Sequence, residues 1–218
     1  MAETKINDNQ LLSGGGHSSS ETFIQTDSYN EEYPQNNSYI DLSPNDPTVL
    51  KSNNSDFYCS FIVAMNELDH EQNIFYVEKV CGIGLDVGAL KSWNWGNNTN
   101  DTVISSVNGG ERYDLKCEIR NDGENTTRKW YRKISDTWTA ITDAEFTDNG
   151  VDPTNTDGIR LFANAADARA PFRGIIVWDS IKIDINGQPA FDATTATKEN
   201  GEGNCYTVHG LIEKTAPF

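Results

Sequence analysis

The strongest constraint on the fold is an alternating segment in the last quarter of the sequence. Apolar residues recur there on one face, with Asp179 as the only interruption: Ile175, Val177, Ile181, Ile183 and Ile185. Successive side chains of a strand point to opposite faces, so this pattern predicts a long strand with one buried face. Asn186-Gly187 follows directly and favours a hairpin, because both turn positions need positive φ. The buried face must pack on a second sheet, which predicts a β-sandwich.

Shorter alternating or apolar segments indicate further strands along the chain. The clearest is 112–120, where Tyr113, Leu115, Cys117 and Ile119 alternate with polar and charged residues. Other strand signals lie at 57–65, 74–90, 102–107, 128–134, 138–141, 158–163 and 205–212. We find no internal repeat and no amphipathic helix longer than about two turns. Residues 51–218 are therefore predicted to form one all-β domain, a two-sheet antiparallel sandwich.

The four cysteines are widely spaced and form no C-x-x-C pair. Cys59 and Cys117 each fall on the apolar phase of a predicted strand, where a cysteine behaves as a small apolar side chain. Core thiols are the favoured interpretation, with disulfides as the alternative. A zinc site would need paired ligand spacing that the sequence lacks.

Residues 1–50 differ in composition from the rest of the chain. They are rich in Ser, Asn, Gln and Gly, and contain one basic residue, Lys5, against eight acidic ones. Their apolar residues are too few to enclose a core, which leaves two interpretations: a disordered leader, or an extended, low-complexity arm that orders on another subunit. We adopt the docking arm as the prediction, with these contact residues: Leu11, Leu12, Phe23, Ile24, Tyr29 and Tyr33.

The balance of charge limits the possible partners. The chain has 33 acidic and 17 basic residues, a net charge of −16. Nucleic acid and anionic membrane surfaces both require a basic face, so neither is expected as a partner. No apolar run approaches the roughly 18 residues of a membrane span, and the N-terminal residues lack the apolar stretch of a secretory signal. We therefore expect assembly in a cytoplasm, which the initiating Met1 favours over the alternative of a signal trimmed before this numbering begins.

The sequence shows no pattern typical of catalysis. Glycoside hydrolases need two carboxylates that face each other across a cleft, and no strand presents such a row. Asp179 is the nearest candidate, although a loop or bulge position explains it more simply. A nucleophile elbow, a P-loop and a dinucleotide-binding glycine motif are also missing. We predict no enzyme and no cofactor. The Asp and Asn clusters at 97–101, 121–125 and 148–157 could hold calcium, but they match no spaced calcium motif and favour solvated turns.

The best candidate for a binding surface is a polar loop with two tryptophans. Sugars are recognised by an aromatic face together with nearby amide and carboxylate groups. The candidate glycan surface therefore comprises Trp93, Trp95, Asn97, Asn98 and Asp101. The alternative is that at least one of these tryptophans belongs to the core or covers a sheet edge. Trp130 and Trp178 are expected to be structural.

The C-terminal half resembles the concanavalin A-like, laminin G-like jelly rolls of bacteriophage virion proteins and bacterial surface proteins. The resemblance covers roughly residues 55–212 and rests on fragments at 110–115, 159–163, 172–176, 181–183, 186–187, 191–192 and 203–208. The chain departs from the family's Gly-Leu-Tyr-Asp element, with Cys205 for the leucine and Thr207 for the aspartate. The resemblance implies an antiparallel jelly-roll sandwich, here preceded by the arm. For function it is weak, because this fold carries lectins, hydrolases and structural modules alike.

Two functions follow from these expectations. The preferred one is a non-enzymatic virion structural protein, a capsid decoration or fibre subunit. It would dock on other virion proteins through its arm, form a homo-oligomer, and present a head that binds host or mucosal glycans. The alternative is an extracellular, carbohydrate-binding or adhesion module of a bacterial surface protein.

Overall fold

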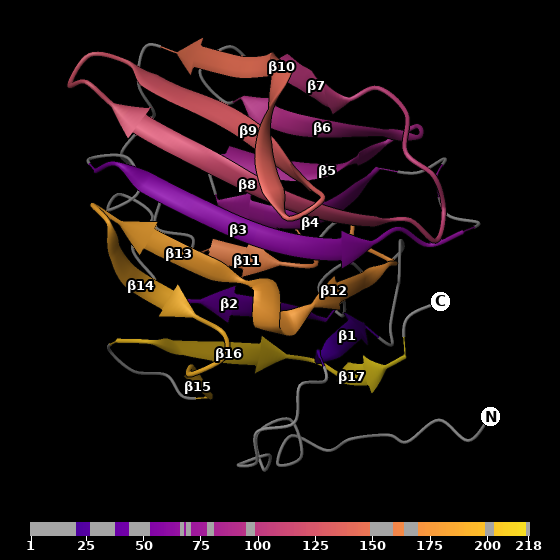
Figure 1. The fold of residues 1–218 in the computed structure, drawn as a ribbon. Helices are drawn as coiled ribbons and strands as arrows, with labels where there is room; N and C mark the ends of the chain where they lie inside the picture. The colour runs from indigo at the N-terminus through magenta and orange to yellow at the C-terminus, as the bar shows by residue number, and fades with distance from the viewer. Residues whose placement is uncertain are drawn as a thin grey trace.

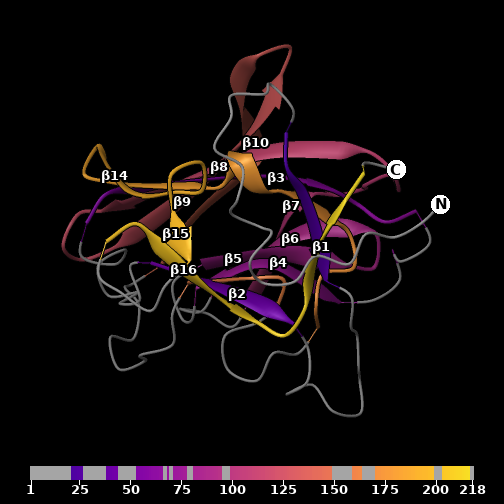
Figure 2. The same ribbon diagram turned by 90° about the horizontal axis from the view of Figure 1, so that it is seen from below.

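Two β-sheets packed face to face form the whole described part of the chain (Figures 1 and 2). The computed structural model describes residues 21–26, 38–43, 53–65, 68, 71–77, 81–94, 99–148, 159–163, 170–198 and 203–216. The long strand pairs within both sheets are antiparallel, and β15 and β16 pair in parallel. The predicted all-β sandwich is therefore confirmed.

The first sheet has the order β10-β9-β8-β3-β12-β1-β17, and β13 pairs with both β3 and β14. Its strands are β1 (Phe23–Thr26), β3 (Ser55–Ile62), β8 (Arg112–Asn121), β9 (Thr126–Ile134), β10 (Thr137–Asp148), β12 (Ile175–Val177), β13 (Lys182–Ile185), β14 (Gln188–Asp192) and β17 (Ile212–Thr215).

The second sheet has the order β15-β16-β2-β11-β4-β5-β6-β7. Its strands are β2 (Tyr39–Leu42), β4 (Gln72–Val77), β5 (Cys81–Asp86), β6 (Ala89–Asn94), β7 (Thr99–Ile104), β11 (Ile159–Leu161), β15 (Thr197–Lys198) and β16 (Cys205–His209).

The core lies between the sheets and follows the alternation of the strands. In β8 every second side chain from Tyr113 to Ile119 is buried, as the pattern predicts. Phe57 of β3 stacks on Phe75 of β4, with ring centroids 3.5 Å apart, so the two sheets meet directly. Each large apolar side chain buried in this way contributes about 1.5–3 kcal/mol to stability.

Three of the four cysteines and two tryptophans occupy the positions expected of core residues. Cys59, Cys117 and Cys205 are buried, in agreement with the predicted role as small apolar side chains. Trp130 and Trp178 are also buried, and Nε1 of Trp178 donates a hydrogen bond to the carbonyl of Ala193 at 3.1 Å. Both tryptophans are structural, as predicted.

The predicted long strand over 175–185 is wrong in one respect, because it is broken in the middle. A single 3₁₀ turn, Trp178–Ser180, separates β12 from β13. Asp179 lies in this turn and accepts a hydrogen bond from the backbone N–H of Thr22. The predicted hairpin at Asn186-Gly187 is confirmed, with φ of 50° and 75° between β13 and β14.

Two segments of the predicted N-terminal arm, β1 and β2, are strands of the sandwich itself. Phe23 and Ile24 belong to β1, which lies between β12 and β17 in the chain's own first sheet, and Ile24 is fully buried. Likewise β2 lies between β11 and β16 in the second sheet. These segments are too short to enclose a core, but neighbouring strands supply one. Leu11, Leu12, Tyr29 and Tyr33 lie outside the described residues.

No helix among the described residues is long and apolar enough to cross a membrane.

Tyr206 gives a test of the packing between the sheets. Its ring meets Trp178 edge-on, with centroids 4.8 Å apart, and its buried hydroxyl has no hydrogen-bond partner among the described residues. Burial raises the pKa of Tyr206 to about 12. The phenol therefore ionises in the unfolded chain, near its ordinary pKa of about 10, before it ionises in the folded one.

We expect Tyr206→Phe to leave stability at pH 7 unchanged or slightly higher, because it removes a buried, unsatisfied hydroxyl. The wild-type protein should lose stability as the pH rises from 10 to 12, by roughly 1 kcal/mol at pH 11 through this residue. The variant should lack that component. Urea unfolding of both proteins at pH 7, 9 and 11 measures it. A variant that is clearly less stable at pH 7 would show that the hydroxyl is satisfied.

Candidate functional site

The β9–β10 hairpin projects from the outer face of the first sheet, away from the second sheet (Figure 2). Near the tip, Thr137–Ala140 of β10 pair with Tyr131–Ile134 of β9. The register then shifts between Ala140 and Glu145, and the pairing resumes lower down. A register shift of this kind bends a hairpin and increases its twist. β10 is thus longer than the predicted strand at 138–141.

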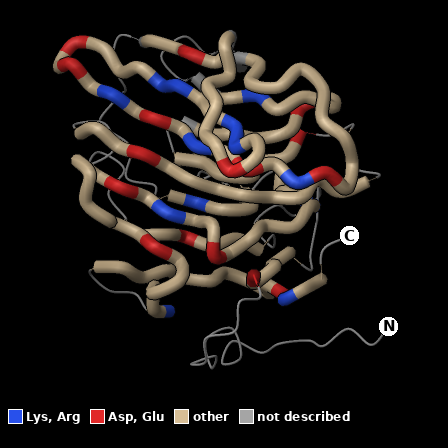
Figure 3. The backbone as a smooth tube through the Cα atoms, in the orientation of Figure 1, with Lys and Arg blue, Asp and Glu red and all other residues tan. Residues whose placement is uncertain are grey.

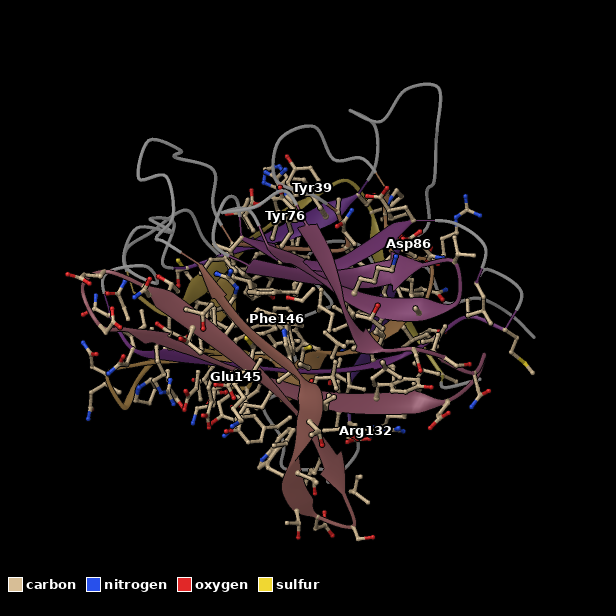
Figure 4. All side chains as sticks on the ribbon, turned by 90° about the horizontal axis from the view of Figure 1, so that it is seen from above. Tyr39, Tyr76, Asp86, Arg132, Glu145 and Phe146 are labelled. Carbon is tan, nitrogen blue, oxygen red and sulfur yellow. The ribbon has the colours of Figure 1, made fainter. Side chains whose placement is uncertain are left out.

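Contacts of Tyr131 and Arg132, where the pairing of β9 with β8 ends, hold the hairpin in this position. Arg132, labelled in Figure 4, donates a hydrogen bond to Glu111 at 2.5 Å, and its guanidinium lies 4.6 Å from the centroid of the Tyr113 ring. The hydroxyl of Tyr131 donates to Glu118 at 2.9 Å. These contacts join β9 to β8 and to Glu111, the residue just before β8. The hairpin therefore has a fixed orientation over the sheet.

The break between β12 and β13 opens onto the same outer face of the first sheet as the hairpin. β3 pairs with β13 at Ser55–Tyr58 and with β12 at Phe61 and Ile62, which leaves Ser60 opposite the 3₁₀ turn. The backbone N–H of Ser60 donates instead to Oγ of Ser180 at 2.7 Å, and that hydroxyl donates to the carbonyl of Val177 at 2.6 Å. A serine side chain thus replaces one missing step of the ladder.

A groove of about 310 Å³ lies between the hairpin and this break. Trp138 and Lys133 line it from the hairpin, Tyr58, Ser60 and Asp114 from β3 and β8, and Asp179, Lys182 and Asp192 from the far side. Trp138 meets Tyr58 edge-on, with ring centroids 5.8 Å apart. The groove therefore combines two aromatic rings with carboxylates, hydroxyls and ammonium groups.

Asp114 is the most constrained polar group in the groove. Its Oδ1 accepts hydrogen bonds from Ser60 at 2.5 Å and from Nε and Nη2 of Arg112 at 3.0 and 2.9 Å. Arg112 also donates to Glu21, and that hydrogen bond is the main cause that raises the pKa of Arg112. No described residue donates to Oδ2 of Asp114, so this oxygen can accept a ligand hydroxyl.

Tyr58 remains a neutral phenol at physiological pH. Partial burial, followed by repulsion from the carboxylates of Asp56 and Asp184, raises the pKa of Tyr58 above its ordinary value. No hydrogen bond from its hydroxyl is found within the described part of the chain. Tyr58 can therefore offer both a ring edge and a hydroxyl to a ligand.

A second depression of about 390 Å³ lies on the same sheet, beside the Asn186-Gly187 turn. It is lined by Asn54, Asp56, Arg120, Asp184 and Asn186. Arg120 contacts Asp56 at 2.6 Å. Oδ1 of Asp184 is buried and has no hydrogen-bond partner among the described residues.

A polar cluster also lies on the second sheet, but its groups bind one another. Asp41 lies between Arg160, at 2.8 Å, and His209, at 3.0 Å. The ring of Tyr39 stacks on His209 at 4.3 Å and lies 3.9 Å below the guanidinium of Arg160. This cluster therefore ties together β2, β11 and β16.

The glycan surface predicted from the sequence is largely outside the described residues. Trp95, Asn97 and Asn98 are not described. The backbones of Trp93 and Asp101 lie on the neighbouring strands β6 and β7, where Trp93 is opposite Asn100 and Ser92 is opposite Asp101. That surface stays a prediction.

Trp138 is the groove residue that the sequence analysis missed as a binding residue. It is paired with Lys133 across the hairpin and lies between Thr137 and Thr139. A tryptophan with polar neighbours so near a hairpin tip has few apolar residues to cover it. That local signal could have identified it.

Of the three Asp- and Asn-rich segments considered for calcium and favoured as solvated turns, 97–101 and 148–157 lie partly or mostly outside the described residues, and only 121–125 is described in full. The 121–125 segment is a turn in which Asp122 accepts hydrogen bonds from the backbone N–H groups of Asn125 and Glu124, which lower the pKa of its carboxyl. Within the described ranges, no three His, Cys, Asp or Glu side chains are grouped so that they could hold a metal ion.

Comparisons with solved structures identify the fold. The LG1–3 region of the laminin α2 chain matches with a TM-score of 0.50 and 13% identity, over 90% of this chain and 35% of the other. Mouse laminin α1 LG4–5 matches at 0.48 and 14%, over 88% and 46%. A Bacteroides ovatus protein, named as a carbohydrate-binding protein, matches at 0.48 and 13%, over 75% and 43%.

The match with a TM-score of 0.50, to the laminin α2 chain, confirms the predicted laminin G-like jelly-roll fold, and at this identity it shows the fold alone. The chain spans between about a third and a half of these structures. No family model matches the sequence. No curated protein matches it either.

We expect Ser180→Ala to destabilise the protein by about 1–3 kcal/mol, because the N–H of Ser60 loses its acceptor in a largely buried position. Ser105→Ala, at an exposed position, is the matched control and should change stability by less than about 0.5 kcal/mol. Urea unfolding measures both. Equal stability of the two variants would show that another group, such as water, satisfies Ser60.

Proposed function

We propose that this chain is a carbohydrate-binding module, and that its ligand binds in the groove between the β9–β10 hairpin and the outer face of the first sheet. The observation that carries the proposal is Trp138, which lines the wall of a groove rich in carboxylates and hydroxyls. Binding without catalysis is part of the proposal.

The residues of the groove match the two kinds of surface that a sugar presents. The C–H groups on one side of a pyranose ring pack on an aromatic ring, while the hydroxyls around its edge need donors and acceptors. Trp138 and Tyr58 supply the aromatic contact. Asp114, already fixed by Ser60 and Arg112, supplies a preorganised acceptor, which reduces the entropy lost on binding.

This proposal corresponds to a carbohydrate-binding module of an extracellular or cell-surface protein. The other expectation, a virion subunit that forms a homo-oligomer and docks through its N-terminal arm, stays a prediction. Its support is reduced because Phe23 and Ile24, two of the expected docking residues, pair within the chain's own sheet. The fold does not decide between the two, because it carries many functions.

The test is binding of the full chain to neutral oligosaccharides, the hexasaccharides of the cellulose, mannan, xylan, laminarin and starch series, measured by calorimetry. We expect at least one to bind and Trp138→Ala to weaken that binding by about tenfold or more, because the stacking surface is lost. Thr139→Ala, an exposed position next to Trp138 on the same strand, is the control and should bind normally.

Circular dichroism should show the same fold for both variants. If no glycan binds, or if both variants bind as the wild type does, the groove is not the site. Release of reducing ends from a bound oligosaccharide would replace the proposal with a hydrolase.

A further inference from the structure

We infer that the ligand is a linear, uncharged glycan chain that lies along β3 and occupies both depressions of the first sheet. The inference rests on the proposed function and adds the shape, length and charge of the ligand. Three observations carry it: the two depressions follow one strand, an ion pair connects them, and their charges nearly balance.

The two depressions follow the outward face of β3. Alternate residues of a strand share one face, so Asn54, Asp56, Tyr58 and Ser60 are arranged in a row. Asn54 and Asp56 line the second depression, and Tyr58 and Ser60 line the groove. From Asn54 to Ser60 the row is about 20 Å long, at about 3.3 Å per residue. One sugar ring is much shorter than this row.

The neighbouring strand β13 connects the same two sites. Lys182 is opposite Tyr58 and lines the groove, and Asp184 is opposite Asp56 and lines the second depression. Nζ of Lys182 lies 3.4 Å from Oδ1 of Asp184. That oxygen is buried, but 17% of the Asp184 side chain is exposed where it lines the second depression, so the exposed part of the carboxylate can accept a hydrogen bond from a ligand hydroxyl.

The charges on this face argue against an acidic ligand. Four cationic residues line the two depressions, Arg112, Arg120, Lys133 and Lys182, against the five carboxylates of Asp56, Asp114, Asp179, Asp184 and Asp192. Figure 3 shows the two signs interleaved across the first sheet. A sulfated sugar or a uronic acid would need an excess of cations, and the whole chain carries −16.

The experiment compares ligand length and ligand charge on the full chain. Calorimetry would measure the disaccharide and the hexasaccharide of each neutral series named above, with a heparin hexasaccharide and a galacturonate hexasaccharide as acidic probes. Asp184→Asn changes a residue that lines the second depression and does not line the groove. Glu145→Gln is the matched control, an exposed carboxylate on β10 outside both depressions.

We expect the neutral hexasaccharide that binds to do so at least about tenfold more tightly than its disaccharide. Asp184→Asn should weaken hexasaccharide binding by about tenfold and leave the disaccharide unchanged, because a hydrogen bond to a charged acceptor is lost. Trp138→Ala should weaken both ligands, and Glu145→Gln neither.

Equal affinity for the two lengths, with no effect of Asp184→Asn, would overturn the inference and leave the proposed function intact. Tighter binding of either acidic hexasaccharide would also overturn it, because the ligand would then be charged. Failure of every glycan to bind would overturn the proposed function itself.

Discussion

The architecture of the first sheet depends on how the two edges of β3 are hydrogen bonded. One edge pairs with β8 along the whole strand, from Ser55 to Ile62. The other edge is shared by β13 and β12, and the gap between them is closed by the hydroxyl of Ser180. A backbone amide cannot remain unsatisfied in a buried position without a cost of about 1–3 kcal/mol. The hydroxyl of Ser180, which accepts the hydrogen bond from Ser60, therefore stabilises the gap.

The groove is a consequence of this gap and of the projecting hairpin. A continuous strand would extend its side chains over the outer face, whereas the 3₁₀ turn directs Asp179 and Ser180 to the rim of the groove. The hairpin forms the opposite wall, because the register shift in β10 bends it away from the sheet plane. Ion pairs such as Arg120 with Asp56 and Lys116 with Glu118 hold the intervening face in a defined arrangement, although each contributes little to stability.

Sequence patterns predicted the parts of the fold that depend on local alternation. β8 and the Asn186-Gly187 hairpin were predictable because side-chain period and turn chemistry are local properties. The buried face of β9 was not predictable from its pattern, because Arg128, a charged residue, is fully buried beside Trp130 on the inward face of this strand. The two strands from residues 1–50 were also missed, because their few apolar residues are buried only by strands distant in sequence.

The sequence by itself determined the all-β class, the buried cysteines and structural tryptophans, and the excess of negative charge. Only the tertiary structure decided which polar residues share a groove. Trp138, Tyr58, Asp114 and Asp179 are separated by as many as 121 positions and come together through strand pairing and the broken ladder. Hydrogen bonds between distant strands fix such positions, and no local period records which strands will be neighbours.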